Sequence, residues 1–297
     1  MSKTTEKETL SIDKSRGLLG WFLILTFLYS TPFYWLIIQY GGIGLYIIGL
    51  MWAPGLAALT SCKAMGVSNR ILGWSWGKNK YHWLSYFLPL GYVLFIYGMA
   101  NALDYVAFIN EKNLNQWGDV LGLNGWATEE ILWMAVPVIM TITILKNISY
   151  ALGEELGWRG LLAPQLLRLF PFPVAATLSG LIWFAWHLPV ILWGGYNSGY
   201  ETLNAQILNF GIMMVALSFP LLYIRIRSGS VWTSAIFHGA HNMALFSLVS
   251  VLFLNTDPNS KYYVGEWSIF IAITTSAIAL YTWYLVHKNG LEKDNAP

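Results

Sequence analysis

Eight apolar stretches, each about 20 residues long, dominate this chain. They lie at about 18–38, 43–62, 84–103, 131–153, 174–194, 206–224, 231–254 and 267–287. About 20 apolar residues in a helix span the hydrocarbon core of a bilayer. Only 11% of the residues are charged, against about 25% in an average soluble domain. The sequence therefore predicts an all-α polytopic membrane protein with about eight transmembrane helices.

The Lys and Arg residues alternate between the two sides of these predicted spans, which supports the number of spans. One side carries only Lys112 and Lys261, and Lys146 lies within the fourth stretch. Because cations concentrate in cytoplasmic loops, both termini are predicted to be cytoplasmic. The protein is predicted to lie in a cell membrane, and its compact length and short tails favour a bacterial inner membrane. The cation-rich side carries Lys3, Lys7, Lys14, Arg16, Lys63, Arg70, Lys78, Lys80, Arg159, Arg168, Arg225, Arg227, Lys288 and Lys293.

No linker divides the apolar body, so a single transmembrane domain is predicted over residues 18–287. Polar cytoplasmic tails, 1–17 and 288–297, flank it. The net charge of +2 gives no indication of a nucleic-acid partner. The lone Cys62 excludes an intrachain disulfide and a Cys-based metal cluster. The lipid bilayer is the partner that the composition implies.

A few ionisable side chains interrupt the apolar stretches. Each costs about 2.5–3.5 kcal/mol at the centre of a membrane helix, so such residues usually mark function. Here they fall in three groups on different spans, which only tertiary packing can bring together. The groups are Glu154, Glu155 and Arg159 in the fourth; His187 in the fifth; His238, His241 and Asn242 in the seventh.

Helical spacing assigns different surroundings to the two adjacent acids. Glu155 and Arg159 are four residues apart and can form an ion pair on one helix face. Glu154 points about 100° away from that pair, so it lacks a full counter-ion and suits a general base. The alternative interpretation is an interfacial salt bridge at a helix end.

The histidines also allow two interpretations each. His187 either serves the chemistry or donates to a neighbouring carbonyl. His238 and Asn242 share a face and offer donors to an oxyanion, whereas His241 lies on another face and is expected to make a hydrogen bond in helix packing. A base, a bound water and oxyanion donors are together the requirements of a hydrolase.

Three motifs, Glu154-Glu155-x-x-x-Arg159, Trp183-x-x-x-His187 and His238-x-x-x-Asn242, resemble the signatures of the CAAX-protease and bacteriocin-processing (CPBP) family of intramembrane endopeptidases. They occur in the same order and on separate spans, within a motif core of residues 149–246. The family usually has Phe where this chain has Trp183, a change that keeps an aromatic ring.

The resemblance implies a role for each of these residues. Glu154 would activate the attacking water, and His187 would orient that water or move its proton. Glu155 and Arg159 would hold the helix and tune Glu154, while His238 and Asn242 would stabilise the oxyanion. The implied partner is a peptide or protein substrate at the membrane.

Two other chemistries use the same residues. Glu154, His187 and His238 could bind a catalytic zinc, leaving one position for water. Buried Glu and His side chains could instead relay protons or bind a cation in a transporter. The spacing alone does not decide between these and a metal-free hydrolase.

The depth of the residues poses a geometric problem. Counting about 1.5 Å per residue puts His187 about 20 Å deep, whereas Glu154 falls near the cytoplasmic interface. The two can meet if the fourth helix continues past Arg159 toward Arg168, or if the fifth begins later than Val174. We expect the former, because Gly160 to Phe170 keep apolar residues at helical spacing, although Pro164 argues against it. A cavity open to the cytoplasmic side would then supply water.

Overall fold

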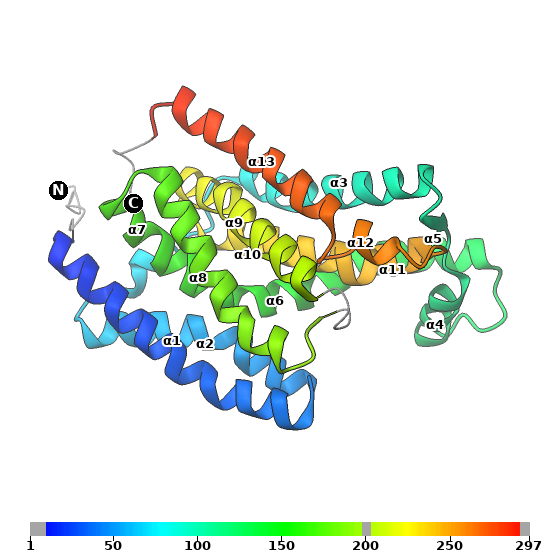
Figure 1. Ribbon diagram of the computed structural model, residues 1–297, viewed down its shortest axis with the longest axis horizontal. Coiled ribbons are helices and arrows are strands. Elements are labelled where there is room, and N and C mark those ends of the chain that lie inside the picture. Colours follow the sequence, from blue (N-terminus) through cyan, green and yellow to red (C-terminus); the bar gives the residue numbers. More distant parts are fainter. Residues whose placement is uncertain (1–9, 198–202, 292–297) are drawn as a thin grey trace, which may run out of the picture.

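The computed structural model describes residues 10–197 and 203–291 and consists almost entirely of helices (Figure 1). In these residues eight helical segments are long and apolar enough to cross a membrane, as predicted. The segments are Ile12–Tyr40, Gly44–Ala64, Asn79–Ala102, Thr128–Leu169, Phe172–Leu192, Leu203–Ser228, Val231–Leu252 and Ile269–Lys288. The all-α polytopic membrane fold predicted from the sequence is thereby confirmed.

Six of the spans are single helices, and the two others are built from several elements. The single helices that cross alone are α1 (Ile12–Tyr40), α2 (Gly44–Ala64), α3 (Asn79–Ala102), α8 (Phe172–Leu192), α9 (Leu203–Ser228) and α13 (Ile269–Lys288). The fourth span joins α5 (Thr128–Val138), η2 (Ile139–Thr143), α6 (Ile144–Glu155), η3 (Leu156–Leu162) and α7 (Ala163–Leu169). The seventh joins α10 (Val231–Met243), η5 (Ala244–Leu248) and α11 (Val249–Leu252).

The first helix starts earlier than its apolar stretch. Helix α1 begins at Ile12, and the Ser11 side chain caps it by accepting from the Lys14 backbone N–H at 3.2 Å. Part of the predicted polar tail 1–17 is thus helical, while residues 1–9 lie outside the described residues, as do 292–297 of the predicted tail 288–297.

The fourth span is a continuous helix of 42 residues, which at about 1.5 Å per residue is about twice as long as a bilayer core requires. Two wider π-helical turns, η2 and η3, interrupt its α-helical geometry. Pro164 is the second residue of α7, directly after η3, where a proline is tolerated. The expected continuation of this helix past Arg159 is confirmed, and it buries Glu154 within the bundle.

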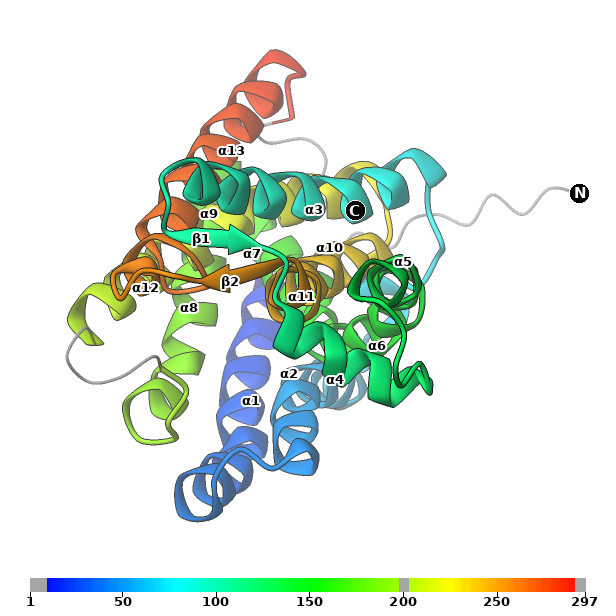
Figure 2. The ribbon, with the colours of Figure 1, turned by 90° about the vertical axis from the view of Figure 1, so that its right-hand side faces the viewer.

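The polar connection after α3 has structure of its own. Strands β1 (Val106–Phe108) and β2 (Phe253–Asn255) pair antiparallel, with Ala107 opposite Leu254 (Figure 2). Helix α4 (Glu111–Leu121) follows β1 and lies with α5 at one end of the molecule (Figure 1). Short elements η1 (Asn69–Leu72) and α12 (Ser260–Tyr263) lie in two other connections.

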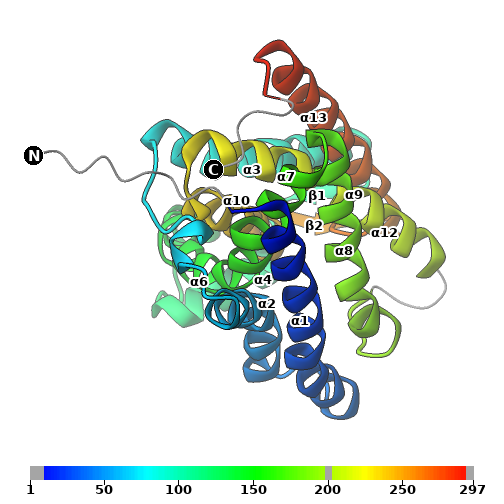
Figure 3. The ribbon, with the colours of Figure 1, turned by 90° about the vertical axis from the view of Figure 1, so that its left-hand side faces the viewer.

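Helix α6 lies at the centre of the bundle, in contact with α2 and α10, while α1 packs along α2 (Figure 3). The contact between α2 and α6 is close because glycines form it. A Cβ atom on Gly153 would lie 2.7 Å from the Met51 carbonyl oxygen, and one on Gly157 would lie 2.5 Å from Pro54 Cβ. Small residues allow membrane helices to approach closely. This contact fixes the helix that carries Glu154 and Glu155.

Candidate active site

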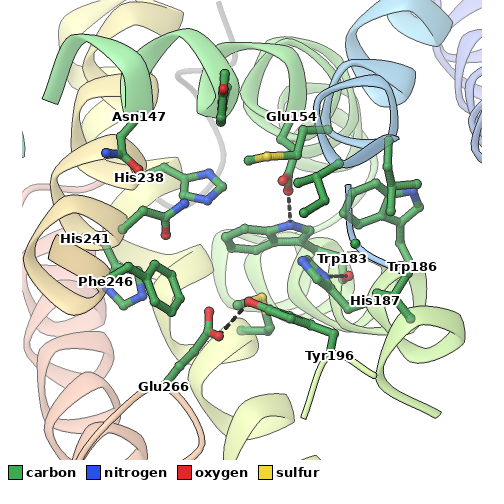
Figure 4. Close-up of a pocket in the computed structure, with 18 of the residues that line it drawn as sticks. Asn147, Glu154, Trp183, Trp186, His187, Tyr196, His238, His241, Phe246 and Glu266 are labelled. Carbon is green, nitrogen blue, oxygen red and sulfur yellow. Dashed lines mark hydrogen bonds between the residues drawn. The ribbon is translucent and has the colours of Figure 1, made fainter. Parts of the chain in front are cut away.

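Glu154 is a buried carboxylate on the wall of an internal cavity, with only 2% of its surface exposed. Its Oε2 accepts hydrogen bonds from the indole Nε1 of Trp183 at 2.7 Å and of Trp158 at 3.2 Å (Figure 4). Its Oε1 has no hydrogen-bond partner among the described residues. Two donors therefore hold one oxygen, and the other remains able to bind a water molecule.

Glu155 forms the predicted ion pair with Arg159. Its Oε1 lies 3.0 Å from Arg159 Nη1, and both side chains are fully buried. The same oxygen lies 3.0 Å from His238 Nδ1, a contact that the sequence did not predict. Glu155 thus joins the first motif to the third.

Arg159 is held from several sides. Its guanidinium lies 4.1 Å from the centre of the Trp183 ring, and its Nη2 donates to Ser218 Oγ at 3.0 Å. Arg225 Nε donates to the Arg159 carbonyl oxygen at 3.0 Å. These contacts fix the η3 turn beside the two glutamates, and π-helical turns are often found at functional sites.

His187 lies half-buried on the cavity wall. Its Nδ1 is 2.9 Å from the Trp183 carbonyl oxygen. Because a carbonyl only accepts, this contact requires the proton on Nδ1, and the neutral ring then has an acceptor at Nε2. The hydrogen bond to a neighbouring carbonyl, which the sequence offered as an alternative to a chemical role, is compatible with one.

His238 and Asn242 both line the cavity, as their shared helix face predicts. His238 is 8% exposed, and Asn242 makes no side-chain hydrogen bond within the described residues. His241 bonds through Nδ1 to the Tyr92 hydroxyl of α3, which is the expected helix-packing contact, and it also lines the cavity.

The cavity has a volume of about 460 Å³, within the range of about 300–1,000 Å³ typical of ligand sites. Its lining includes loop residues from the α1–α2, α8–α9 and α12–α13 connections, all at the cation-poor end of the bundle. No described residue of the loops at the cation-rich end lines it. In the predicted orientation, the loops that line the cavity therefore lie at the end of the bundle opposite to the cytoplasm. These loop residues are Gly42, Gly194, Gly195, Tyr196 and Glu266.

The zinc alternative requires Glu154, His187 and His238 to lie close enough together to bind one ion. Among residues 10–197 and 203–291, no three His, Cys, Asp or Glu side chains are placed to hold one metal ion. Glu154 Oε2 is already bound by two indoles. Glu154, His187 and His238 share a cavity but do not fit a zinc ion together, so no step is assigned to a metal.

Sequence reasoning missed two residues of the cavity, Glu266 and Tyr196. The Tyr196 hydroxyl donates to Glu266 Oε2 at 2.6 Å, on the side away from Glu154 (Figure 4). Glu266 precedes the last span by only a few residues and belongs to none of the three motifs. The sequence signal that could have indicated Glu266 is its position directly before the predicted span 267–287.

The fold and the cavity define a polytopic membrane protein with buried acidic and imidazole side chains gathered from three spans. Residues 133–244 match a family model described as Type II CAAX prenyl endopeptidase Rce1-like. The "CAAX prenyl protease 2" of Methanococcus maripaludis is 29% identical to this chain over 112 residues. That match covers 36% of this chain and 39% of the relative, so it spans about two fifths of the relative's length.

The matched segment carries Glu154, Glu155, Arg159, His187, His238 and Asn242. Both comparisons confirm the resemblance to CAAX proteases that the three motifs indicate, and the family model places it in residues 133–244.

Proposed function

We propose that this protein is an intramembrane endopeptidase that hydrolyses peptide bonds of membrane-associated peptides or proteins. The observation that supports this most is the gathering of Glu154, His187, His238 and Asn242 around one cavity from three separate spans. The similarity to CAAX prenyl endopeptidases supports the same reaction class.

In the proposed first step, Glu154 Oε1 takes a proton from a water molecule whose oxygen attacks the substrate carbonyl carbon. The two indole donors on Oε2 stabilise the carboxylate form that this step requires. His187 Nε2 is an acceptor on the same cavity and would orient the water. General-base assistance of this kind contributes about 10²–10⁴-fold to a rate.

The resulting oxyanion would be stabilised by Asn242 and His238. The Asn242 amide donates directly, whereas His238 Nε2 can donate only when the ring carries both protons, because Nδ1 already faces Glu155. The Glu155 carboxylate supplies the counter-charge for that doubly protonated ring. When the C–N bond breaks, the proton on Glu154 passes to the leaving amine, which restores the carboxylate.

A zinc-dependent route is an alternative to be tested. Purified protein would be stripped with a chelator and assayed before and after stoichiometric zinc. We expect cleavage to persist in the stripped protein. Complete loss on stripping and recovery with zinc would contradict the metal-free mechanism.

The substrate can be sought by comparing membrane proteomes of cells that express the wild type or Glu154→Ala. We expect specific peptides to accumulate uncleaved in the variant. A proton- or cation-coupled transporter, the other function considered, is not favoured by either comparison. Ion-coupled uptake into proteoliposomes that Glu154→Gln abolishes, with no peptide cleaved, would replace the hydrolase proposal.

The proposed location is a bacterial inner membrane, with both termini in the cytoplasm. Single cysteines at Lys112 and Lys78, introduced after Cys62→Ser, test the orientation with a membrane-impermeant thiol reagent on whole cells. We expect labelling at position 112 and none at position 78. The opposite pattern would show that the protein has the inverse orientation, in which the loops that line the cavity lie on the cytoplasmic side.

A further inference from the structure

Glu266 is a buried carboxyl group on the cavity wall for which the described residues provide no positive partner. Its exposed fraction is 7%, and none of the ion pairs within residues 10–197 and 203–291 includes it. Its hydrogen-bond partner is the Tyr196 hydroxyl. Buried carboxylates are usually paired with a cation. Because Glu266 faces the cavity, a bound molecule in the cavity could supply that positive charge.

The surroundings of Glu266 suit an organic cation. Tyr196 orients the carboxyl group, and the Tyr196 ring packs at 5.1 Å from Trp267 and at 6.3 Å from His187. The Phe246 ring lies nearby on the same cavity (Figure 4). Aromatic faces attract ammonium and guanidinium groups. Here the aromatic rings lie close to the Glu266 carboxyl group, so an organic cation could contact both.

The charge state of Glu266 fits the same interpretation. Burial raises the pKa of Glu266 to about 7, and the nearby Glu154 charge adds to that rise. The Tyr196 hydrogen bond and His238 act in the opposite direction. A carboxyl group with this pKa is only partly ionised near neutral pH, and a cation bound beside it would favour the ionised form.

Glu266 is placed apart from the proposed base. Figure 4 shows Glu154 and Glu266 on opposite sides of the cavity, with His238 at the level of Glu154 and His187 at a level between the two acids. The Glu266 carboxyl comes from the loop before α13, at the cation-poor end where other loops line the cavity. This position suits contact with a substrate side chain better than contact with the scissile bond.

We propose that Glu266 and Tyr196 form a specificity subsite that binds a basic side chain of the peptide substrate. This inference rests on the proposed endopeptidase function of the cavity. A metal ion is a poorer occupant, because no further acidic, His or Cys side chains among the described residues complete a ligand set around Glu266. The subsite would select peptides with Lys or Arg near the cleaved bond.

Binding can be measured without turnover, using full-length Glu154→Gln protein in detergent. The test compares two N-acetylated peptide libraries, one that contains Lys and one in which norleucine replaces every Lys. We expect the Lys library to be retained at least 10-fold more strongly, and Glu154→Gln/Glu266→Gln protein to retain both libraries equally. Tyr196→Phe, which removes the hydroxyl that orients Glu266, should reduce the preference for the Lys library.

Each other outcome has a distinct meaning. Equal retention of both libraries by Glu154→Gln protein would overturn the subsite while leaving the endopeptidase proposal intact. Stronger retention of a norleucine library with a free amino terminus would assign the site to the peptide's terminal amine instead, which also overturns a side-chain subsite. If wild-type protein neither retains nor cleaves any peptide, the proposed function fails, and the subsite fails with it.

Discussion

Glu155 Oε1 accepts a hydrogen bond from His238 Nδ1 at 3.0 Å, although 83 residues separate the two in the chain. The same oxygen pairs with Arg159. One buried carboxylate therefore holds two cationic or potentially cationic groups in place. In the proposed reaction Glu155 orients His238 as an oxyanion donor, whereas Glu154 takes the proton from the attacking water.

Glu155→Ala should destabilise the protein strongly. It leaves the fully buried Arg159 without its counter-charge, and breaking a buried pair in this way costs about 3–5 kcal/mol. Thermal unfolding in detergent measures the effect, with Glu129→Ala as a control because Glu129 is exposed near the start of α5. Equal melting temperatures for the two variants would contradict the structural role of Glu155.

Trp183→Phe should lower kcat about 10–100-fold without unfolding the protein. The change removes the indole donor at 2.7 Å from Glu154 Oε2 but keeps an aromatic ring beneath Arg159. Hydrogen bonds to charged groups contribute about 1.5–3 kcal/mol. Trp186→Phe, which loses a bond to Ser30 instead, is the matched control. An unchanged kcat in Trp183→Phe would show that this donor does not support the base.

Gly153→Ala should lower both the melting temperature and the activity. The added methyl group would meet the Met51 carbonyl oxygen and push α2 away from α6. Gly91→Ala on α3 is the control, because its Cβ would meet no atom within 4 Å. The control should be neutral or slightly stabilising, since Ala favours a helix over Gly by about 1 kcal/mol. Similar losses in both variants would rule out a specific contact at Gly153.

Glu266→Gln should make the protein more stable than the wild type at pH 8 but not at pH 4. The folded-state pKa of Glu266 is raised to about 7 from an ordinary 4.5, so the folded state holds its proton more tightly than the unfolded state. Wild-type stability therefore falls as pH rises from about 4.5 to 7, by up to about 3 kcal/mol. Melting temperatures of the wild type and Glu266→Gln between pH 4 and pH 8 test this prediction. The same pH dependence in both proteins would contradict the burial of Glu266.

The sequence predicts the spans well because lipid leaves few alternatives to long apolar helices. The spacing of Glu155 and Arg159 also predicts their ion pair, since both lie on one helix. The continuation of the fourth helix required a choice that the sequence allowed but did not force. Pro164 is accommodated because the η3 turn precedes it.

The remaining features depend on contacts between distant segments. The bond from His238 to Glu155 and the two indoles on Glu154 arise only when α6, α8 and α10 pack together. Glu266 enters the cavity from a loop, where no helical period applies. Which loops line the cavity likewise follows from packing.

The most direct test of the central proposal is hydrolysis of a peptide library by purified wild-type and Glu154→Gln protein, with the products identified by mass spectrometry. Gln keeps the size of the side chain but cannot take the proton of water. We predict that the wild type cuts defined peptide bonds and that Glu154→Gln, with an unchanged melting temperature, cuts none above background. Cleavage of the same bonds by Glu154→Gln at the wild-type rate would contradict the assignment of Glu154 as the base.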